Sequence, residues 1–337
     1  MTKRDLFLKA LHCQNAGPPP IWLMRQAGRY MPDYKALRSK YSLIEMFHHP
    51  ELIVEVTRLP LNLLDVDAAI LFSDILIVLD AFEIPWHFEE GIGPILPKTP
   101  PHPSSLCHKK AIETYPQIYQ AIKTLKEGIE VPLIGFAGAP FTVASYLIEG
   151  KTSRDLQKTK QWMFQDASSF HQLLQKIADA TIDYLNLQID AGVDVIQLFD
   201  SWAHVLNQRH FQEFSLCYMK KILDGVKNPS IPMILFCRGS CFFLQDLAQL
   251  KPTGISVDWS GELSSLRQQI PKGIALQGNL DPVLLLSSRA VIRSEAKHLL
   301  ASMKEFPGYI FNLGHGILPE TPFENVKFLV DYVHDYA

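Results

Sequence analysis

A helical segment followed by a short apolar run, Ser168–Asp200 (SSFHQLLQKIADATIDYLNLQIDAGVDVIQLFD), decides the expected fold. Apolar side chains recur in Ser168–Ala191 with a period of about 3.6 residues, which predicts a helix with one buried face. The run Val195–Phe199 is too short for a helix and lacks polar alternation, as expected for a parallel strand covered on both faces. A strand that follows a helix so closely indicates a β/α repeat.

Seven further apolar runs of this kind lie along the chain. They are Pro20–Met24, Ala68–Ser73, Pro132–Phe136, Met233–Phe236, Gly254–Val257, Ile274–Leu276 and Tyr309–Leu313. Eight strands alternating with helices predict an α/β fold, a single (β/α)8 TIM barrel over residues 1–337, with its active-site cleft at the C-terminal ends of the strands. An open doubly wound sheet is the alternative, but its glycine fingerprint is absent. The proline-rich residues 83–105 are expected to form an irregular excursion.

Composition restricts the class of protein. The 337 residues include 32 Lys and Arg and 35 Asp and Glu, so the formal net charge is −3, which argues against a nucleic-acid partner. Prolines and glycines interrupt the uncharged stretch Val131–Ile148, so no membrane segment is expected. Five irregularly spaced cysteines and an N-terminus without an apolar signal core predict a cytoplasmic protein without disulfides.

Polar residues follow the expected strands, where the active site of a barrel lies. In strand order they are Arg25, Gln26, Ala27, Gly28 and Arg29, then Asp74, Tyr146 (six residues after Pro140), Asp200 with Ser201, Arg238, Asp258, Gln277-Gly278-Asn279, and His315. Each alone has an ordinary structural explanation. Together they predict a cleft mouth that carries guanidinium groups, a carboxylate, hydroxyls and an imidazole.

Arg25 and Arg29 carry the most information. Their guanidinium groups share one face if Gln26–Arg29 is helical, and Gly28 allows a ligand to approach the backbone. Because like charges repel, the pair favours a bound anion, and the arginine fork suits a carboxylate or a phosphate. A salt-bridge cluster with Asp33 is the structural alternative.

Asp74 lies in the apolar stretch Leu71–Ile77, where a carboxylate is costly to bury unless it is hydrogen-bonded or paired. It either accepts N–H donors and stabilises a cation, or caps a helix N-terminus. The hydroxyls of Tyr146 and Ser201 are open to structural or binding roles. Glycines on both sides of His315 favour a binding role for its imidazole.

At these residues the sequence resembles the uroporphyrinogen decarboxylase family of haem biosynthesis. The longest matching segments are Pro20–Tyr34 and Gly135–Thr142, and Phe72–Leu76, Leu276–Pro282 and Asn312–Gly316 are also similar. These segments span nearly the whole chain. The resemblance implies a (β/α)8 barrel without cofactor or metal, usually a homodimer, with uroporphyrinogen as its small-molecule substrate.

The implied reaction converts the four acetate side chains of uroporphyrinogen III to methyl groups, giving coproporphyrinogen III. A pyrrole protonated at the carbon that bears the acetate is the electron sink. The resemblance implies catalytic roles for Asp74 and Arg25. The implied substrate-binding residues are Arg25, Gln26, Ala27, Gly28, Arg29, Asp74, Tyr146, Ser201 and His315. The chain departs from the family at His204, where a small glycine is common, and at Cys237-Arg238-Gly239-Ser240.

Two other functions stay open at this level. A zinc-dependent thiol methyltransferase of the same superfamily would need thiolate and imidazole ligands, for which Cys237, Cys241 and His315 are candidates. No His-x-Cys pair follows the fifth strand, which argues against it. A non-catalytic tetrapyrrole carrier would bind the same substrate without releasing CO2.

Overall fold

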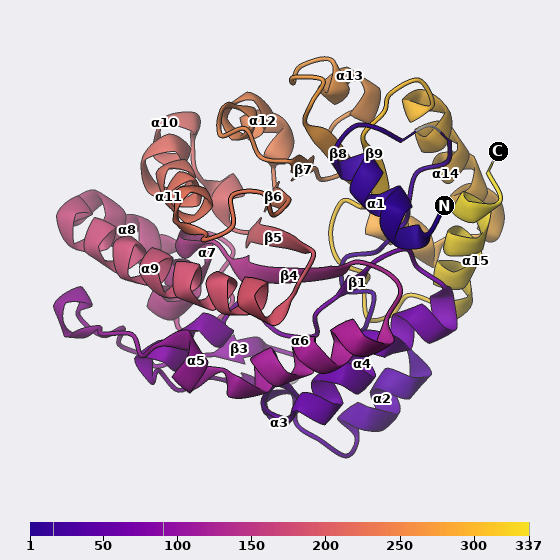
Figure 1. The fold of residues 1–337 in the computed structure, drawn as a ribbon. Coiled ribbons are helices and arrows are strands. Elements are labelled where there is room, and N and C mark those ends of the chain that lie inside the picture. The colour runs from indigo at the N-terminus through magenta and orange to yellow at the C-terminus, as the bar shows by residue number, and fades with distance from the viewer. Residues whose placement is uncertain (16, 90, 337) are drawn as a thin grey trace.

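The structure, a computed structural model, describes residues 1–15, 17–89 and 91–336. In this part of the chain, seven strands form one parallel sheet. In sheet order they are β1 (Ala69–Ile70), β4 (Leu133–Gly138), β5 (Val195–Asp200), β6 (Met233–Cys237), β7 (Gly254–Ser256), β8 (Ala275–Leu280) and β9 (Tyr309–Leu313). Helices surround the sheet (Figure 1), so the predicted α/β barrel architecture is confirmed.

The first apolar run occupies the eighth position of the barrel, between β9 and β1, and is called the seam segment (Pro20–Met24) here. Ile21 forms an isolated parallel bridge with Phe311 of β9. On the other side, the Asp67 N–H donates to the Ile21 carbonyl (2.7 Å), and the Ile21 N–H donates to the Asp67 carboxylate (2.8 Å). Where a full strand was expected, one bridge and one carboxylate therefore close the barrel.

The seam segment is short because side chains take its backbone donors. The Leu23 N–H donates to Gln26 Oε1 (3.2 Å), and the Met24 N–H donates to Asn312 Oδ1 (3.0 Å). Pro20, which opens the segment, has no N–H at all. A regular ladder to β9 thus cannot continue along the segment.

Helices alternate with the strands as predicted. The α-helices are α1 (Lys3–Leu11), α2 (Pro32–Arg38), α3 (Leu43–His48), α4 (Pro50–Leu64), α5 (Ala111–Thr114), α6 (Pro116–Gly128), α7 (Pro140–Glu149), α8 (Gln157–Gln165), α9 (Ala167–Ala191), α10 (Gln208–Phe211), α11 (Cys217–Gly225), α12 (Ser240–Gln249), α13 (Leu263–Arg267), α14 (Arg289–Met303) and α15 (Phe323–His334). Shorter or wider helical turns are η1 (Ile77–Phe82), η2 (Pro103–Ser105), η3 (Ala203–Val205), η4 (Gln212–Leu216) and η5 (Pro282–Leu286).

Helix α9 shows how the helices attach to the sheet. α9 begins after Asp166, whose side chain accepts from the Ser169 N–H, and ends at Gly192 with a left-handed φ of 110°. Its Gln188 amide pairs with both backbone groups of Phe136 in β4 (each 2.9 Å). A Cβ at Gly135 would overlap the Gln188 oxygen, so only glycine fits beside this pair.

Two local expectations are corrected. β8 runs to Leu280, so Gln277, Gly278 and Asn279 lie inside the strand rather than after it. Residues 83–105, expected to be irregular, contain an antiparallel ribbon of β2 (His87–Glu89) and β3 (Gly93–Ile95). Gly91, in the turn between the two strands, adopts a positive φ of 79°, which favours this pairing despite the prolines.

The two ends of the barrel interior differ. At the N-terminal end, Phe7, Ala10 and Leu11 of α1 seal the barrel against inward residues of the strands, which are Trp22, Ala68, Ile134, Val195, Ile234, Ala275 and Ile310. A polar layer follows, in which Trp22 Nε1 donates to Gln277 (2.8 Å) and Gln277 donates to Gln197 (3.1 Å). Nearest the C-terminal end lies a second apolar layer of Met24, Phe136, Phe199 and Phe236.

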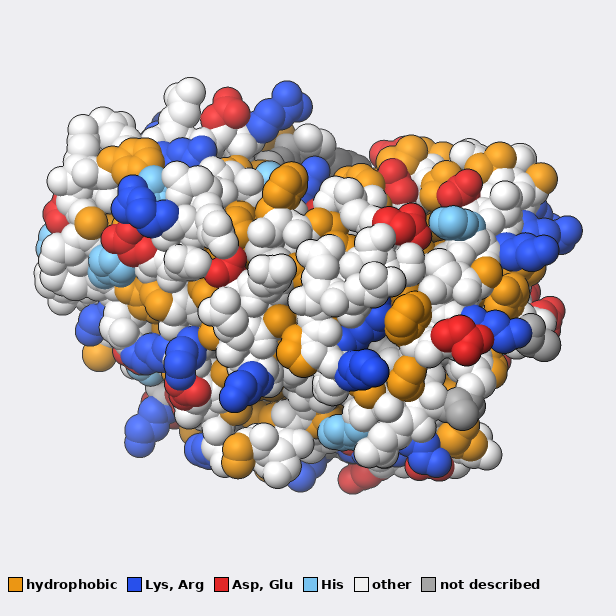
Figure 2. Space-filling model, turned by 90° about the horizontal axis from the view of Figure 1, so that it is seen from above, with side chains coloured by type: hydrophobic (Ala, Val, Ile, Leu, Met, Phe, Trp, Pro, Cys, Tyr) orange, Lys and Arg blue, Asp and Glu red, His pale blue; other side chains and the backbone are white. Residues whose placement is uncertain are grey.

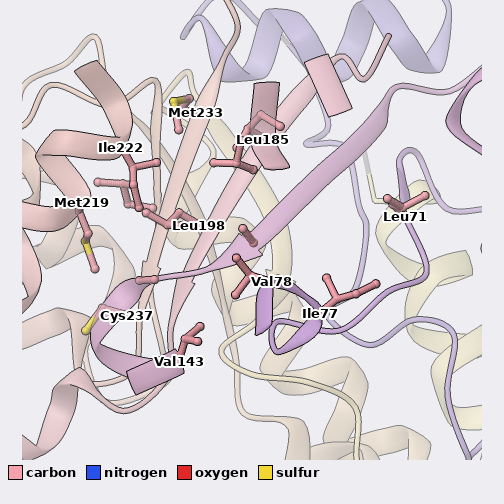
Figure 3. Close-up of a cluster of buried hydrophobic side chains, with 14 of the residues drawn as sticks. Leu71, Ile77, Val78, Val143, Leu185, Leu198, Met219, Ile222, Met233 and Cys237 are labelled. Atoms are coloured by element: carbon pink, nitrogen blue, oxygen red, sulfur yellow. The ribbon is translucent and has the colours of Figure 1, made fainter. Parts of the chain in front are cut away.

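The larger core lies between the sheet and its helices. Figure 3 shows part of it, where Leu198 of β5 and Met233 of β6 lie near Leu185 of α9 and Met219 and Ile222 of α11. All five side chains are buried. Within the described residues, no helix is long and apolar enough to cross a membrane.

We expect His334→Gln to weaken the seam in a pH-dependent way. The hydrogen bond that His334 donates to the Asp67 carboxylate raises the pKa of His334, whose Nε2 lies 3.0 Å from that carboxylate. A raised folded-state pKa contributes stability that is complete below the unfolded value and is lost as pH rises through the folded value. The variant should lose about 1 kcal/mol of unfolding free energy near pH 6 and little near pH 9, measured by urea denaturation.

His298→Gln is the matched control, since His298 is an exposed histidine 3.5 Å from Glu262. It should change the unfolding free energy little at either pH. An equal loss for His334→Gln at both pH values would contradict the assignment of a charged pair.

Candidate active site

A cleft opens at the C-terminal ends of the strands, with an empty volume of about 1010 Å³ including its open mouth. Met24, Phe136 and Phe199 from the upper apolar layer form its floor. Phe88 and Pro94 of the β2–β3 ribbon line its wall. The lining is mostly apolar, with a few polar groups around it, as in sites that bind small organic molecules.

The structure brings most of the predicted site residues together. Those that line the cleft are Arg25, Gln26, Ala27, Asp74, Tyr146, Ser201 and His315. Gly28 and Arg29 lie outside this lining. Residues 26–29 form turns and bends instead of the helix considered above, because the helical backbone begins only at Pro32, the first residue of α2. Arg25 and Arg29 therefore do not share a helical face.

Arg25 is held by its backbone and by the segment after β9. Its φ of 61° is left-handed, an uncommon conformation for a residue with a side chain. The aliphatic part of its side chain lies against Gly316, where a Cβ would overlap Arg25 Cδ. No ion pair joins Arg25 or Arg29 to Asp33 in the part of the chain that the structure describes. The salt-bridge cluster considered above is therefore wrong for these residues.

Asp74 lies in the turn before η1 and is not the N-cap of that helix, which is Leu76. Its Oδ1 accepts from the Leu76 N–H (2.8 Å), which shapes the turn into η1. Burial raises the pKa of the Asp74 carboxyl, although the Leu76 N–H and the charge of Arg25 oppose this shift. One carboxylate oxygen is thus structural, while the group as a whole borders the cleft in a weakly hydrated position.

His315 is neutral at physiological pH. Burial, reinforced by the charges of Arg25 and Arg238, lowers the pKa of its imidazole to about 3. The ring packs edge-on against Phe236, with 5.9 Å between centroids. His315 therefore provides one uncharged donor and one uncharged acceptor beside two guanidinium groups.

Tyr146 and Ser201 come from neighbouring connections. Tyr146, in α7, packs perpendicular to Trp202 with 5.9 Å between ring centroids. Burial raises the pKa of Tyr146, and the charge of Asp74 adds to this effect. The phenol is a neutral hydrogen-bonding group at physiological pH, as is the Ser201 hydroxyl.

The turn that carries Ser201 is fixed by the buried carboxylate of Asp200, the last residue of β5. Thr142 and Ser215 donate their hydroxyls to it, and Thr142 Oγ1 accepts from the Trp202 N–H (2.9 Å). Burial raises the pKa of Asp200 to about 6. Its two oxygens are occupied by these hydroxyls, so Asp200 positions the turn and does not face the cleft.

Arg29 lies at the outer edge of the site. Its side chain is exposed. Burial raises the pKa of Tyr34 in α2, whereas the charges of Arg38 and Arg29 oppose that shift and Asp74 adds to it. The charges of Arg29 and Asp74 thus both act on the Tyr34 phenol, but Arg29 lies outside the lining of the cleft and can meet only a ligand that extends beyond it.

The thiols do not form a metal site with His315. In the described ranges, no group of three His, Cys, Asp or Glu side chains could hold a metal ion. Burial raises the pKa of the Cys237 thiol well above its ordinary value and that of Cys241 to about 11. Metal ligation needs thiolates, so these environments oppose it.

Sequence reasoning missed the ribbon that closes one side of the cleft. Phe88 and Pro94 reach the cavity only because β2 and β3 pair. The alternation in His87–Glu89 and the glycines that follow were the available signal, which the surrounding prolines obscured. Trp202, the packing partner of Tyr146, was also missed, although it directly follows Ser201.

We expect Arg25→Gln to raise the pKa of His315, because one of the charges that lower it disappears. The new value should stay below the ordinary one, since burial persists. The titration is followed by NMR of the imidazole protons. Arg29→Gln is the control and should leave the titration unchanged. An equal response to both substitutions would mean that Arg25 does not lie beside His315.

Comparisons with known proteins agree with this geometry. The family model described as Uroporphyrinogen decarboxylase (URO-D) matches residues 2–336. A protein named uroporphyrinogen decarboxylase from Protochlamydia amoebophila (strain UWE25) is 52% identical and covers 98% of this chain and 92% of its own length. One of that name from Carboxydothermus hydrogenoformans (strain ATCC BAA-161 / DSM 6008 / Z-2901) is 42% identical over 99% of this chain and 97% of its own.

Solved structures support the fold. A methyltransferase from Methanosarcina mazei superposes with a TM-score of 0.84 and 23% identity, covering 99% of each chain. A B12-independent methionine synthase from Shewanella sp. W3-18-1 gives a TM-score of 0.55 at 10% identity, covering 95% of this chain and 94% of its own. At these identities the likeness concerns architecture alone. The full-length sequence matches decide the family: the chain belongs to the uroporphyrinogen decarboxylase family.

Proposed function

We propose that this protein decarboxylates the four acetate side chains of uroporphyrinogen III to give coproporphyrinogen III in haem and tetrapyrrole biosynthesis. The observation that carries the proposal is the position of Asp74 and Arg25 at the rim of one cleft with an apolar floor. A flat tetrapyrrole fits such a floor, and its carboxylates fit the cationic rim. Full-length relatives that bear this name support the reaction.

Asp74 stabilises the positive charge that develops on the pyrrole ring. Its carboxylate accepts pyrrole N–H groups, and protonation of the pyrrole carbon then places a cation beside it. Burial disfavours an isolated Asp74 carboxylate. The attraction between this carboxylate and the ring cation is therefore stronger in the cleft than the same attraction would be in water. The stabilisation is therefore largest when the ring is protonated, which is the state that loses CO2.

Arg25 orients the reacting arm and completes the catalytic pair. Its guanidinium binds an acetate carboxylate through two N–H groups, which fixes that arm over the cleft. Tyr146, Ser201 and neutral His315 offer hydrogen bonds to the other carboxylates or pyrrole N–H groups. Arg29 meets a carboxylate arm at the outer edge, while Gln26, Ala27 and Gly28 support the backbone of this turn.

The floor of the cleft favours the product of bond cleavage. Met24, Phe136 and Phe199 present apolar surface. The acetate carboxylate of the substrate loses hydration against such a surface, which costs free energy. Neutral CO2 does not need that hydration and is not penalised in the same way. The electrons of the broken C–C bond enter the protonated pyrrole and leave an exocyclic methylene group. A second proton at the side-chain carbon completes the methyl group, and the first proton then leaves the ring carbon, which restores the neutral pyrrole. This chemistry requires neither a cofactor nor a metal.

We also propose that the protein is cytoplasmic and homodimeric and that it has no nucleic-acid partner. A cytoplasmic location is supported by five free cysteines. On the face drawn in Figure 2, acidic and basic side chains are interspersed, which gives no support to a nucleic-acid partner. Family resemblance is the support for a homodimer, and light scattering on the purified chain tests it.

Asp74→Asn tests the catalytic carboxylate. The neutral amide keeps the size of the side chain and removes a buried charge, so thermal stability should not fall. Turnover should drop by roughly a hundred-fold or more, since the ring cation loses its counter-charge. An anaerobic assay that quantifies coproporphyrinogen measures the change. Asp33→Asn, at an exposed position of α2, is the matched control. Near-normal turnover in Asp74→Asn would refute the role.

Arg29→Lys tests the outer carboxylate contact. Lysine keeps the charge but cannot form two parallel hydrogen bonds. The Michaelis constant for uroporphyrinogen should rise several-fold, roughly as for one lost charged hydrogen bond, with a smaller effect on kcat. Arg293→Lys, exposed on α14, should change neither constant. The role is wrong if the Michaelis constant of Arg29→Lys equals that of the parent protein.

A further inference from the structure

The side chains placed around the substrate so far come from one side of the barrel. Arg25 follows the seam segment, and His315 follows β9 beside it. Asp74, Tyr146 and Ser201 follow β1, β4 and β5. In the order of eight positions around the barrel, the connection after β6 lies opposite Arg25. A ligand with carboxylates around its whole edge needs a positive partner there.

Arg238 is the first residue after β6, in the turn that leads to α12, and lies just outside the residues that line the cavity. Phe236, two residues earlier, points into the upper apolar layer and packs against His315. The parallel register pairs Phe199 of β5 with Phe236, which puts Arg238 level with Ser201. Ser201 lines the cleft. The geometry thus directs the Arg238 side chain toward the same mouth, on the wall opposite Arg25.

Two observations place the Arg238 charge near His315, which lines the cleft. After burial and Arg25, it is the next contribution that lowers the pKa of His315. Its guanidinium carbon lies 5.8 Å from the ring centroid of Trp259, over the indole face. Trp259 in turn lies against Gly314, where a Cβ would approach its backbone. The aromatic face orders the guanidinium and leaves its N–H groups unused.

The guanidinium has no carboxylate partner among the residues that the structure describes. Asp258, at the end of the neighbouring strand, already accepts from the Gly239 N–H (2.6 Å) and from the Ser260 hydroxyl (2.6 Å). Arg238 itself is exposed at the rim. An exposed, ordered arginine beside a substrate cleft is suited to bind an anion from solution.

We propose that Arg238 binds a carboxylate arm of the substrate on the wall of the cleft opposite Arg25. This inference rests on the proposed function for the identity of the ligand. The two arginines would hold the flat ring from opposite edges, with His315 as a neutral donor and acceptor between them. Arg238 is a positioning residue, since it touches an arm distant from the carbon that reacts.

The test compares Arg238→Gln, Arg238→Lys and the surface control Arg209→Gln with the parent protein. Arg209 is exposed on α10 and pairs with Glu213. Steady-state constants are measured anaerobically with uroporphyrinogen III. Binding of oxidised uroporphyrin, which keeps all the carboxylates but is not turned over, is measured in parallel by fluorescence quenching at low and high salt.

Arg238→Gln should raise the Michaelis constant and weaken uroporphyrin binding by about ten-fold or more, with kcat changed less than two-fold. Arg238→Lys keeps the charge but not the two-pronged contact, so it should recover part of the loss, and added salt should reduce the difference between parent and Arg238→Gln. The control should match the parent. Constants within two-fold of the parent for Arg238→Gln, or a loss that Arg238→Lys does not recover, would overturn the proposal. Absence of turnover in the parent would instead refute the proposed function, and the measurement of uroporphyrin binding would still decide the role of Arg238.

Discussion

The Asp67 carboxylate closes the barrel, and the position of the cleft residues depends on that closure. It accepts the Ile21 N–H at the seam, lies 3.0 Å from His334 and contacts Lys3 at 3.4 Å. A buried carboxylate with a backbone donor and two cationic partners is well compensated. Arg25 follows the seam segment directly, so an open seam would release Arg25 together with the barrel edge.

The two ends of the barrel interior differ in role: the N-terminal end contributes to stability, and the C-terminal end carries the polar groups of the cleft. The N-terminal end is filled by α1 and small or branched side chains, which exclude water. At the other end the floor is equally apolar, but the rim carries Arg25, Arg238 and Asp74. Charges near a low-dielectric floor interact more strongly than they would in water. The net charge of −3 therefore says little about the cleft, where the local balance is positive.

The parts that could be predicted from sequence follow from repeated local patterns. Buried parallel strands are short apolar runs, so the strands and the residues after them could be located without the structure. The ribbon at Phe88 and Pro94 could not, because proline is common in loops and hides a short pairing. The placement of Arg29 also failed, since it assumed a helix where the chain makes turns before Pro32. Convergence of Tyr146 and Ser201 with Asp74 could be predicted only through the barrel that the number of strands implied, because no local pattern contains it.

A rim built for carboxylates also imposes a direction on the reaction. The substrate enters with eight carboxylates and leaves with four, so each removed acetate takes away one charge that a cationic rim attracts. The propionates persist, so a residue such as Arg238 that holds one of them would bind every intermediate. Attraction to the rim falls as acetates are lost, which favours exchange of product for substrate. The neutrality of His315 fits this requirement, since a further fixed cation would hold the four-carboxylate product more tightly.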